Sequence, residues 1–245
     1  MIRSNSLLFA LALGSSAVCA QESAHWGYKG DVAPAKWAQL SPEFAVCGTG
    51  KNQSPIDIQG SIKAKLPKVP FSYQSGGNEI VNNGHTIQIN YVQGSQISVD
   101  GDAFTLKQFH FHAPSENTVH GKRYAMEMHL VHKNASGELT VVAVMFDKGA
   151  ANPELEKLWR VMPQQAEQNV SIKQDLNLNK LLPKNKTYWR FSGSLTTPPC
   201  SEGVTWIVLK QPLTVSAEQL ARFTQTMHHD NNRPVQSLHG RVVVE

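Results

Sequence analysis

Short apolar or alternating runs separated by turn residues dominate the chain from Pro70 onward. Alternation with a period of two places successive side chains on opposite faces of a strand, so these runs predict a half-buried β-sheet. Turn signals such as Asn82-Asn83-Gly84 and Asp100-Gly101-Asp102 favour hairpin connections. The clearest predicted strands are residues 87–92, 103–111, 125–132, 139–146 and 204–209.

Helix signals are few. Asn152-Pro153-Glu154 begins a short amphipathic stretch that ends near Met162, and Ser216-Ala217-Glu218 begins another that ends near Met227. The sequence contains no internal repeat and no long linker, and its polar motifs are scattered along the whole chain. It therefore predicts a mainly β, single-domain fold with a few short peripheral helices.

The N-terminal segment has the pattern of a secretory signal peptide. Arg3 supplies a positive start, residues 7–13 form an apolar run, and Val18-Cys19-Ala20 is a small-residue cleavage site. We expect a signal peptide at 1–20 and a mature domain at 21–245. Lipid attachment at Cys19 is the alternative, which Val18 immediately before it disfavours. No later stretch reaches the roughly 20 apolar residues of a membrane helix, so no membrane span is expected.

Cleavage after Ala20 leaves two cysteines, Cys47 and Cys200. An even number of cysteines in a secreted chain predicts a disulfide, with two buried thiols as the alternative.

With 245 residues and 40% hydrophobic content the chain can bury a substantial core. The net charge of +4 is mild and its basic residues are scattered, which argues against a nucleic-acid partner.

Three of the ten histidines stand apart by their spacing. His110 and His112 are two residues apart in an alternating run, so both imidazoles point to one face of the strand. His129 lies on the next predicted strand, which can run back antiparallel and complete a three-histidine face. Three neutral imidazoles bind Zn²⁺ and leave one position for water, as in catalytic zinc sites. Ordinary surface or core histidines are the alternative.

Gln108 and Glu127 each lie two residues from a proposed ligand, on the same face of the predicted sheet. Zinc-binding imidazoles usually donate their second N–H to such a group, which fixes the tautomer and aims the ring. We therefore expect Gln108 to accept from His110 and Glu127 to accept from His129. For Glu127 the alternative is a solvent-exposed carboxylate on an edge strand.

Longer motifs surround these residues. In chain order they are Trp26-Gly27-Tyr28, Gln53-Ser54-Pro55-Ile56-Asp57, Asn82-Asn83-Gly84-His85, residues 108–112 with 115–119 and 127–132, Ser194-Leu195-Thr196-Thr197-Pro198-Pro199-Cys200 and Asn231-Asn232-Arg233-Pro234-Val235-Gln236. Together they resemble the α-class carbonic anhydrases of the secreted bacterial type, over essentially all of residues 21–245.

The resemblance implies a central, mostly antiparallel twisted ten-stranded sheet with zinc at the base of a conical cleft. It implies a lyase, carbonate dehydratase, that reversibly hydrates carbon dioxide to bicarbonate and a proton by attack of zinc-bound hydroxide. Cys47 and Cys200 match the positions of a disulfide in secreted bacterial members. A location in the bacterial periplasm and a homodimer are further expectations.

The resemblance also implies roles for individual residues. Thr196 matches the threonine whose hydroxyl accepts a hydrogen bond from the zinc hydroxide, and Glu116 matches the acceptor to which that hydroxyl donates. His85 matches the histidine that carries protons to buffer, a role that suits imidazole because it titrates near neutral pH. The residues that match the substrate-binding wall and a second hydroxyl beside it are Val131, Val142, Leu195, Trp206 and Thr197.

Two other functions use the same fold or metal. A catalytically silent, carbonic anhydrase-like binding module is expected to lose a zinc histidine, whereas all three are present. A zinc-dependent esterase would use the same hydroxide on an activated carbonyl, but the sequence shows no evident pocket for a specific acyl group.

Overall fold

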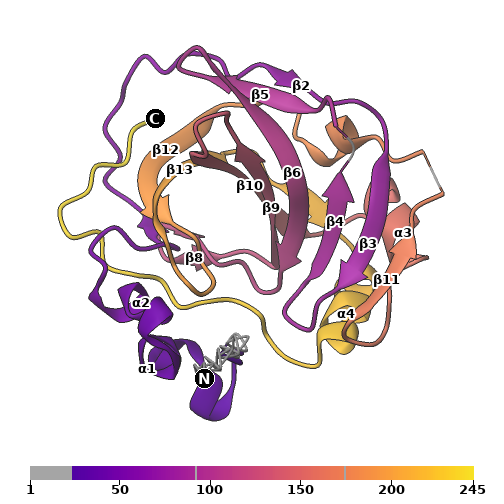
Figure 1. The fold of residues 1–245 in the computed structure, drawn as a ribbon. Coiled ribbons are helices and arrows are strands. Elements are labelled where there is room, and N and C mark those ends of the chain that lie inside the picture. The colour runs from indigo at the N-terminus through magenta and orange to yellow at the C-terminus, as the bar shows by residue number, and fades with distance from the viewer. Residues whose placement is uncertain (1–23, 92, 174) are drawn as a thin grey trace, which may run out of the picture.

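The computed structural model describes residues 24–91, 93–173 and 175–245. The expected signal peptide and its cleavage site lie outside these residues. Among them, no helix has the length and apolar character needed to cross a membrane. Within the described part of the chain, a large twisted sheet forms the body of the molecule and short helices lie around its margins (Figure 1).

The large sheet has eleven strands in the described residues, with the central order β11-β3-β4-β6-β9-β10-β13-β12. Its strands are β2 (Phe71–Ser72), β3 (Gly77–Asn82), β4 (Ile87–Tyr91), β5 (Gln96–Val99), β6 (Asp102–His112), β9 (Met126–Lys133), β10 (Leu139–Lys148), β11 (Gln168–Ser171), β12 (Tyr188–Ser194), β13 (Glu202–Leu209) and β14 (Leu213–Val215). A separate small sheet contains β1 (Asp57–Ile58), β7 (Thr118–Val119) and β8 (Lys122–Arg123).

Most strand pairs are antiparallel, whereas β10 pairs in parallel with both β13 and β14. The expected mainly β fold with a twisted, mostly antiparallel sheet is confirmed. The sheet has eleven strands where ten were expected, because very short segments such as β2 and β14 pair at its margins.

The helices are short, as expected from the sequence. They are α1 (Trp37–Leu40), α2 (Val46–Thr49), α3 (Pro153–Trp159) and α4 (Ala217–Met227), with 3-10 turns η1 (Gly30–Val32), η2 (Pro34–Lys36), η3 (Pro42–Phe44) and η4 (Leu178–Leu181). The Asn152 side chain caps α3 and a Ser216–Gln219 capping box begins α4, which satisfies backbone N–H groups that have no partner inside the helix.

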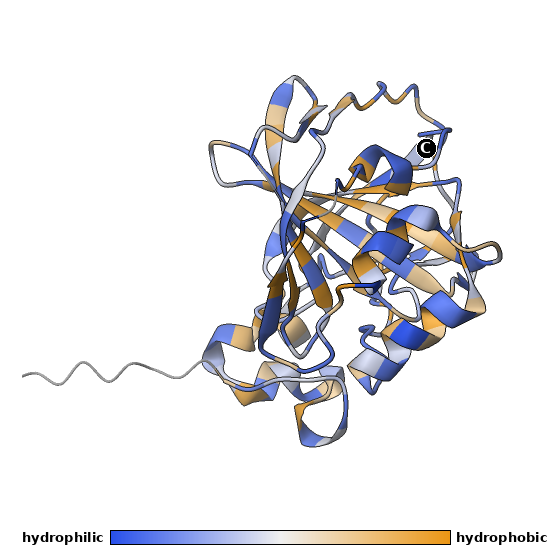
Figure 2. Ribbon diagram, turned by 90° about the vertical axis from the view of Figure 1, so that its right-hand side faces the viewer, coloured by the Kyte–Doolittle hydropathy of each residue, from blue (hydrophilic) through white to orange (hydrophobic). Residues whose placement is uncertain are grey.

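Alternation along β6 and β9 divides their side chains between two faces. Phe109, Phe111 and Met128 point into the larger hydrophobic core cluster, so the intervening histidines point to the opposite face. Figure 2 shows this pattern as orange and blue stretches that alternate along the strands. A second cluster around Trp206 and Val141 packs beside the histidine face. The site therefore lies on the face of the sheet opposite the larger core, beside the second cluster.

Candidate metal centre

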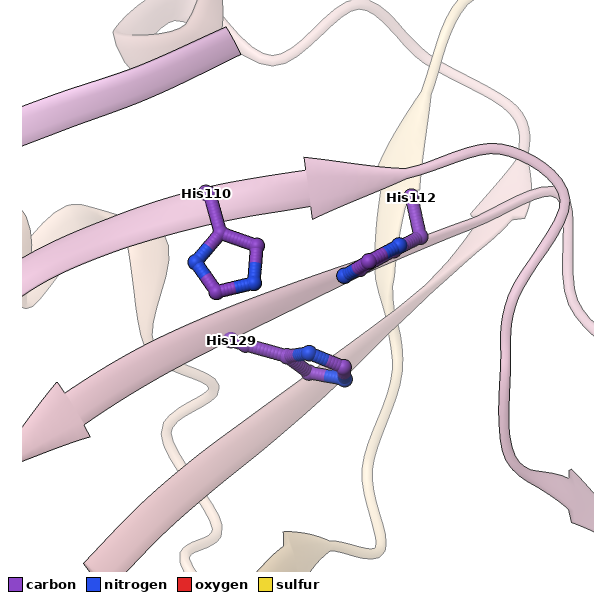
Figure 3. Close-up of side chains that lie close together, drawn as sticks. All are labelled: His110, His112 and His129. Atoms are coloured by element: carbon purple, nitrogen blue, oxygen red, sulfur yellow. The ribbon is translucent and has the colours of Figure 1, made fainter. Parts of the chain in front are cut away.

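Three histidines converge on one point. His110 and His112 project from β6, and His129 projects from β9, directly opposite His110 in the antiparallel register. One ring nitrogen of each lies within 4.8 Å of the corresponding nitrogens of the other two. Figure 3 shows the three rings facing one another. The antiparallel three-histidine face predicted from the spacing is confirmed.

The second nitrogen of each ring has an acceptor. His110 Nδ1 lies 2.8 Å from Gln108 Oε1, and His129 Nε2 lies 2.9 Å from Glu127 Oε1. His112 Nδ1 lies 2.7 Å from the backbone oxygen of Asn231. Because each acceptor is an oxygen that only accepts, each of these ring nitrogens donates its proton. Nε2 of His110, Nε2 of His112 and Nδ1 of His129 are left with free lone pairs.

These three lone pairs fit a zinc ion. His112 and His129 are each 1% exposed, and burial lowers the pKa of all three imidazoles, so they stay neutral at ordinary pH. Among the described residues, His112 Nε2 is a buried atom without a hydrogen-bond partner. Such an atom is costly unless something binds it. Three neutral imidazoles form the donor set of an open zinc site, with room for one further ligand.

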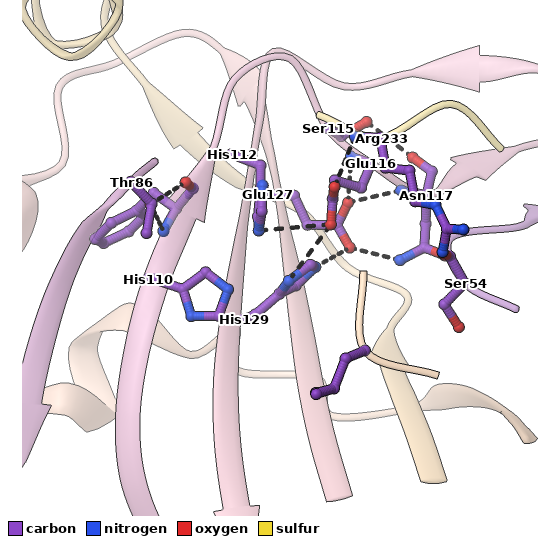
Figure 4. Close-up of polar contacts among 12 residues, drawn as sticks. Ser54, Thr86, His110, His112, Ser115, Glu116, Asn117, Glu127, His129 and Arg233 are labelled. Atoms are coloured by element: carbon purple, nitrogen blue, oxygen red, sulfur yellow. Dashed lines mark hydrogen bonds and ion pairs between the residues drawn. The ribbon is translucent and has the colours of Figure 1, made fainter. Parts of the chain in front are cut away.

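Glu127 is buried and held by several hydrogen bonds. Its Oε2 accepts from the backbone N–H groups of Glu116 and Asn117 at 2.7 and 2.8 Å, and its Oε1 also accepts from Asn117 Nδ2 at 2.7 Å (Figure 4). Burial raises the pKa of Glu127, and the Asn117 hydrogen bonds lower it. The alternative of a solvent-exposed edge carboxylate is wrong, because Glu127 is 0% exposed.

Glu116 and Thr196 lie together beside the histidines. Glu116 Oε1 accepts from the Arg233 backbone N–H at 2.8 Å, while Oε2 lies 3.5 Å from His112 Nε2 and 3.8 Å from His129 Nδ1. Burial raises the pKa of Glu116 to about 8, against the lowering effect of the Arg233 N–H and the nearby Thr196 hydroxyl. The structure thus brings Glu116 and Thr196 together, as the resemblance implied.

A hollow of about 110 Å³ opens beside the centre. Its lining includes His110, His112, Thr197 and His85. The half-buried His85 ring stacks on Trp26, with ring centroids 3.8 Å apart and planes 7° from parallel. Burial lowers the pKa of His85, and His25 and His229 lower it further. One titratable imidazole therefore shares a small hollow with two of the metal-binding histidines.

Comparison with known proteins decides the family. A sequence profile of the eukaryotic-type carbonic anhydrase family matches residues 32–245. The chain belongs to the α-class carbonic anhydrase family. It is 60% identical over 225 residues to a carbonic anhydrase of Klebsiella pneumoniae, covering 91% of this chain and 92% of the relative. It is 44% identical over 244 residues to a carbonic anhydrase of Neisseria gonorrhoeae, covering 99% and 96%.

Solved structures agree. The α-carbonic anhydrase of Thermovibrio ammonificans, solved with the inhibitor sulfanilamide, is 52% identical with a TM-score of 0.90, covering 91% of this chain and all of that one. Together with the three convergent histidines, these findings identify a zinc-dependent lyase that hydrates carbon dioxide reversibly. Neither the silent binding module nor the esterase gains support from them.

The apolar wall of this carbonic anhydrase differs from the expected one at a single position. Val131, Leu195 and Trp206 belong to one hydrophobic cluster beside the histidines. Val142 does not, because it lies opposite Leu130 and Ile207 in the core on the other face of the sheet. The prediction for Val142 is therefore wrong.

Val141 takes the place that Val142 was expected to fill. It pairs with Val131 on β9 and with Trp206 on β13, and it belongs to their cluster. Adjacent strand residues face opposite ways, so a shift of one position along the strand moves the side chain away from the site.

The C-terminal segment and the disulfide complete the centre of this carbonic anhydrase. Cys47 and Cys200 form the predicted disulfide, and the Cys200 backbone N–H donates to Thr197 O at 2.8 Å. Arg233, 2% exposed, donates to Cys47 O at 2.8 Å and to Gln53 Oε1 at 2.9 Å. Arg233 thus ties the disulfide segment to Glu116.

Sequence reasoning missed three residues that orient the centre: Asn117, Asn231 and Arg233. Asn231 and Arg233 lie in one of the quoted motifs, and Asn117 follows Glu116 directly. Their position in the motifs was visible in the sequence. Their contacts with His112, Glu116 and Glu127 were not, because they join segments far apart in the chain.

Proposed function

We propose that this carbonic anhydrase hydrates carbon dioxide with separate residues of this centre that bind the metal, orient the nucleophile, position the substrate and remove the proton. The observation that supports the proposal best is the set of three neutral histidines, each anchored through one nitrogen and presenting the other to a common point. A zinc ion held there lowers the pKa of a water molecule to about 7 and so supplies hydroxide, an effect for which carbonic anhydrase itself is the reference case.

Thr196 and Glu116 orient the nucleophile. A hydroxyl has one proton, and Glu116 Oε2 is a buried acceptor that has no hydrogen-bond partner among the described residues. When the Thr196 proton is donated to Glu116, the Thr196 oxygen can only accept from what faces it. The pair thus accepts a hydrogen bond from the nucleophile and turns its lone pair toward the substrate.

The apolar wall positions the substrate. Carbon dioxide is small and apolar, and Val131, Val141, Leu195 and Trp206 form a cluster beside the histidines. An apolar surface of this kind contacts carbon dioxide favourably. It offers no hydrogen bonds to the charged product bicarbonate, so it does not stabilise that anion. Thr197, which lines the hollow, supplies a hydroxyl near the substrate.

His85 carries the product proton away. The hollow that it shares with His110 and His112 holds about 110 Å³, room for a few water molecules that link the centre to the imidazole. Because burial lowers its pKa, His85 is mainly neutral at neutral pH and ready to accept. Stacking on Trp26 fixes the ring at the edge of the hollow.

We infer further that the mature domain, residues 21–245, acts after export, in the periplasm of a bacterium. The Cys47–Cys200 disulfide supports this, because disulfides persist in oxidising compartments and are rare in the cytosol. Bacterial relatives at 44–60% identity support the same source. A homodimer stays a prediction, which light scattering on the purified protein tests.

The proton-transfer role is tested with His85→Ala. We expect turnover at saturating substrate to fall roughly 10-fold or more in a non-imidazole buffer and to recover with added imidazole. Interconversion of carbon dioxide and bicarbonate at chemical equilibrium, followed by isotope exchange, should keep its rate. His239→Asn is the control, since His239 is exposed and Asn tolerates its positive φ. Slowed interconversion without imidazole rescue would contradict the role.

A further inference from the structure

A second hollow lies away from the metal centre. It holds about 500 Å³ and is lined by Ala64, residues 66–69 and residues 184–188, together with Lys210 and Glu245. We name it the lysine groove. Tyr188 and Leu209 pair at one end of the β12–β13 ladder, whereas Ser194, two residues before Thr196, pairs at the other. Six residues of strand separate these ends, about 20 Å.

The floor of the lysine groove is apolar. Leu66 and Val69 pack against the main core while still reaching the groove, and the buried Tyr188 lies beside them. Hollows of a few hundred Å³ with an apolar lining and a few polar groups are typical of small-molecule sites. The floor therefore suits the apolar body of a small ligand.

The rim is positively charged. Lys68, Lys184 and Lys186 line it and are exposed, and Lys210 is the fourth lysine. Lys210 forms a 2.6 Å ion pair with Glu245, the one acidic side chain of the lining. None of the other three lysines has an acidic partner within 4.0 Å among the described residues. Counting side chains alone, four lysines against one glutamate give the lining a net of +3, where the side chains of the whole chain give +4.

Hydrogen bonds hold the walls of the lysine groove in place. Tyr188 Oη donates to Pro67 O at 2.8 Å, which joins the two lining segments. The Asn185 backbone N–H donates to Gln211 Oε1 and the Lys210 N–H donates to Thr187 O, both at 2.9 Å. A preformed wall lowers the conformational entropy lost when a ligand binds.

We propose that the lysine groove binds a small organic anion, with its carboxylate or other oxyanion head among Lys68, Lys184 and Lys186 and its apolar body on Leu66 and Val69. The carbon dioxide reaction uses none of these residues. Charge complementarity selects the head group, and contact with the apolar floor selects the body. The lysine groove shares no residue with the metal centre, so its binding is independent of the metal.

The test uses the zinc-loaded protein and two probes, octanoate and the anionic fluorophore 8-anilinonaphthalene-1-sulfonate. We expect the fluorophore to bind with one-to-one stoichiometry, octanoate to displace it and acetate to displace it far less well. Saturation of the catalytic cleft with sulfanilamide should leave the fluorophore bound. Binding should also weaken with added salt, because the lysines are exposed to solvent.

Two triple variants locate the site. Replacing Lys68, Lys184 and Lys186 together by Gln should weaken both probes about tenfold. The matched control replaces the exposed Lys107, Lys133 and Lys180 by Gln, removes the same charge and should change affinity less than twofold. Both variants should keep wild-type carbon dioxide hydration, which shows that they fold.

Several results would overturn the proposal: equal binding by the two triple variants, displacement of the fluorophore by sulfanilamide, or no binding of either probe. Attachment to vesicles of anionic phospholipid without binding of free octanoate would assign the charge to a membrane surface instead. Failure of any of these tests leaves the carbon dioxide chemistry untouched, because the lysine groove shares no residue with the metal centre.

Discussion

Glu127→Gln changes one atom and should have a large effect. Each carboxylate oxygen of Glu127 accepts from two donors: Oε1 from His129 Nε2 and Asn117 Nδ2, and Oε2 from the backbone N–H groups of Glu116 and Asn117. A glutamine has one oxygen and one NH₂ group. Whichever way the amide turns, its NH₂ faces two donors that have lost their acceptor.

The magnitude follows from these contacts. A buried donor left unsatisfied costs about 1–3 kcal/mol, so two of them cost about 2–6 kcal/mol. His129 can avoid part of this cost by moving its proton from Nε2 to Nδ1. That proton then occupies the lone pair that faces the zinc position, so metal binding has to reverse the shift. We expect zinc affinity to fall about 10- to 100-fold, the usual effect of losing such a partner.

The assay separates stability from metal binding. Urea unfolding of the metal-free protein measures the first, and zinc competition with a fluorescent chelator measures the second. Gln108→Ala is the comparison, since it removes a single acceptor from His110 and should cost less in both measurements. Wild-type stability together with wild-type zinc affinity in Glu127→Gln would refute the hydrogen-bond reasoning.

Three further predictions concern separate parts of the protein. Thr196→Val should lower kcat/KM for carbon dioxide about 100-fold at unchanged zinc content, while Thr196→Ser retains most of it, because Ser keeps the hydroxyl that donates to Glu116. Val141→Phe should slow hydration about 100-fold, because the larger side chain occupies the space beside the apolar wall where carbon dioxide binds. Val142→Leu should affect only stability. The reverse pattern would show that Val142, and not Val141, belongs to the wall. Burial lowers the pKa of His132 from 6.5 to about 3, so the unfolded chain takes up a proton that the native state excludes. Stability should therefore fall by about 2 kcal/mol between pH 7 and pH 5 from this residue alone, a loss that urea unfolding should find absent in His132→Gln.

Much of the metal centre could be predicted from local pattern. Two histidines at i and i+2 must share a strand face, and a glutamine or glutamate two residues from a ligand must share it too. These rules act within one strand, so they located His110, His112, Gln108 and Glu127. The same rule explains the error at Val142. Neighbouring residues of a strand face opposite sides of the sheet, so an error of one residue in matching this strand to the family assigns the wrong side chain to the substrate wall.

The rest of the centre depends on segments far apart in the sequence. Asn231 O accepts the His112 proton across 119 positions, and the Arg233 backbone N–H reaches Glu116 across 117. No periodicity within a strand reports such a contact. The expected count of ten strands came from the family resemblance; the pattern could not correct it, because two- and three-residue strands such as β2 and β14 carry too few positions to show alternation.

The central claim is that three buried histidines hold a zinc ion on which carbon dioxide hydration depends. Stopped-flow hydration on the purified protein tests it most directly, before zinc removal by a chelator, after removal, and after one equivalent of zinc is restored. We predict fast hydration that disappears with the metal and returns at one zinc per chain. Hydration that survives complete removal of zinc, or its absence with one zinc bound, would contradict the claim.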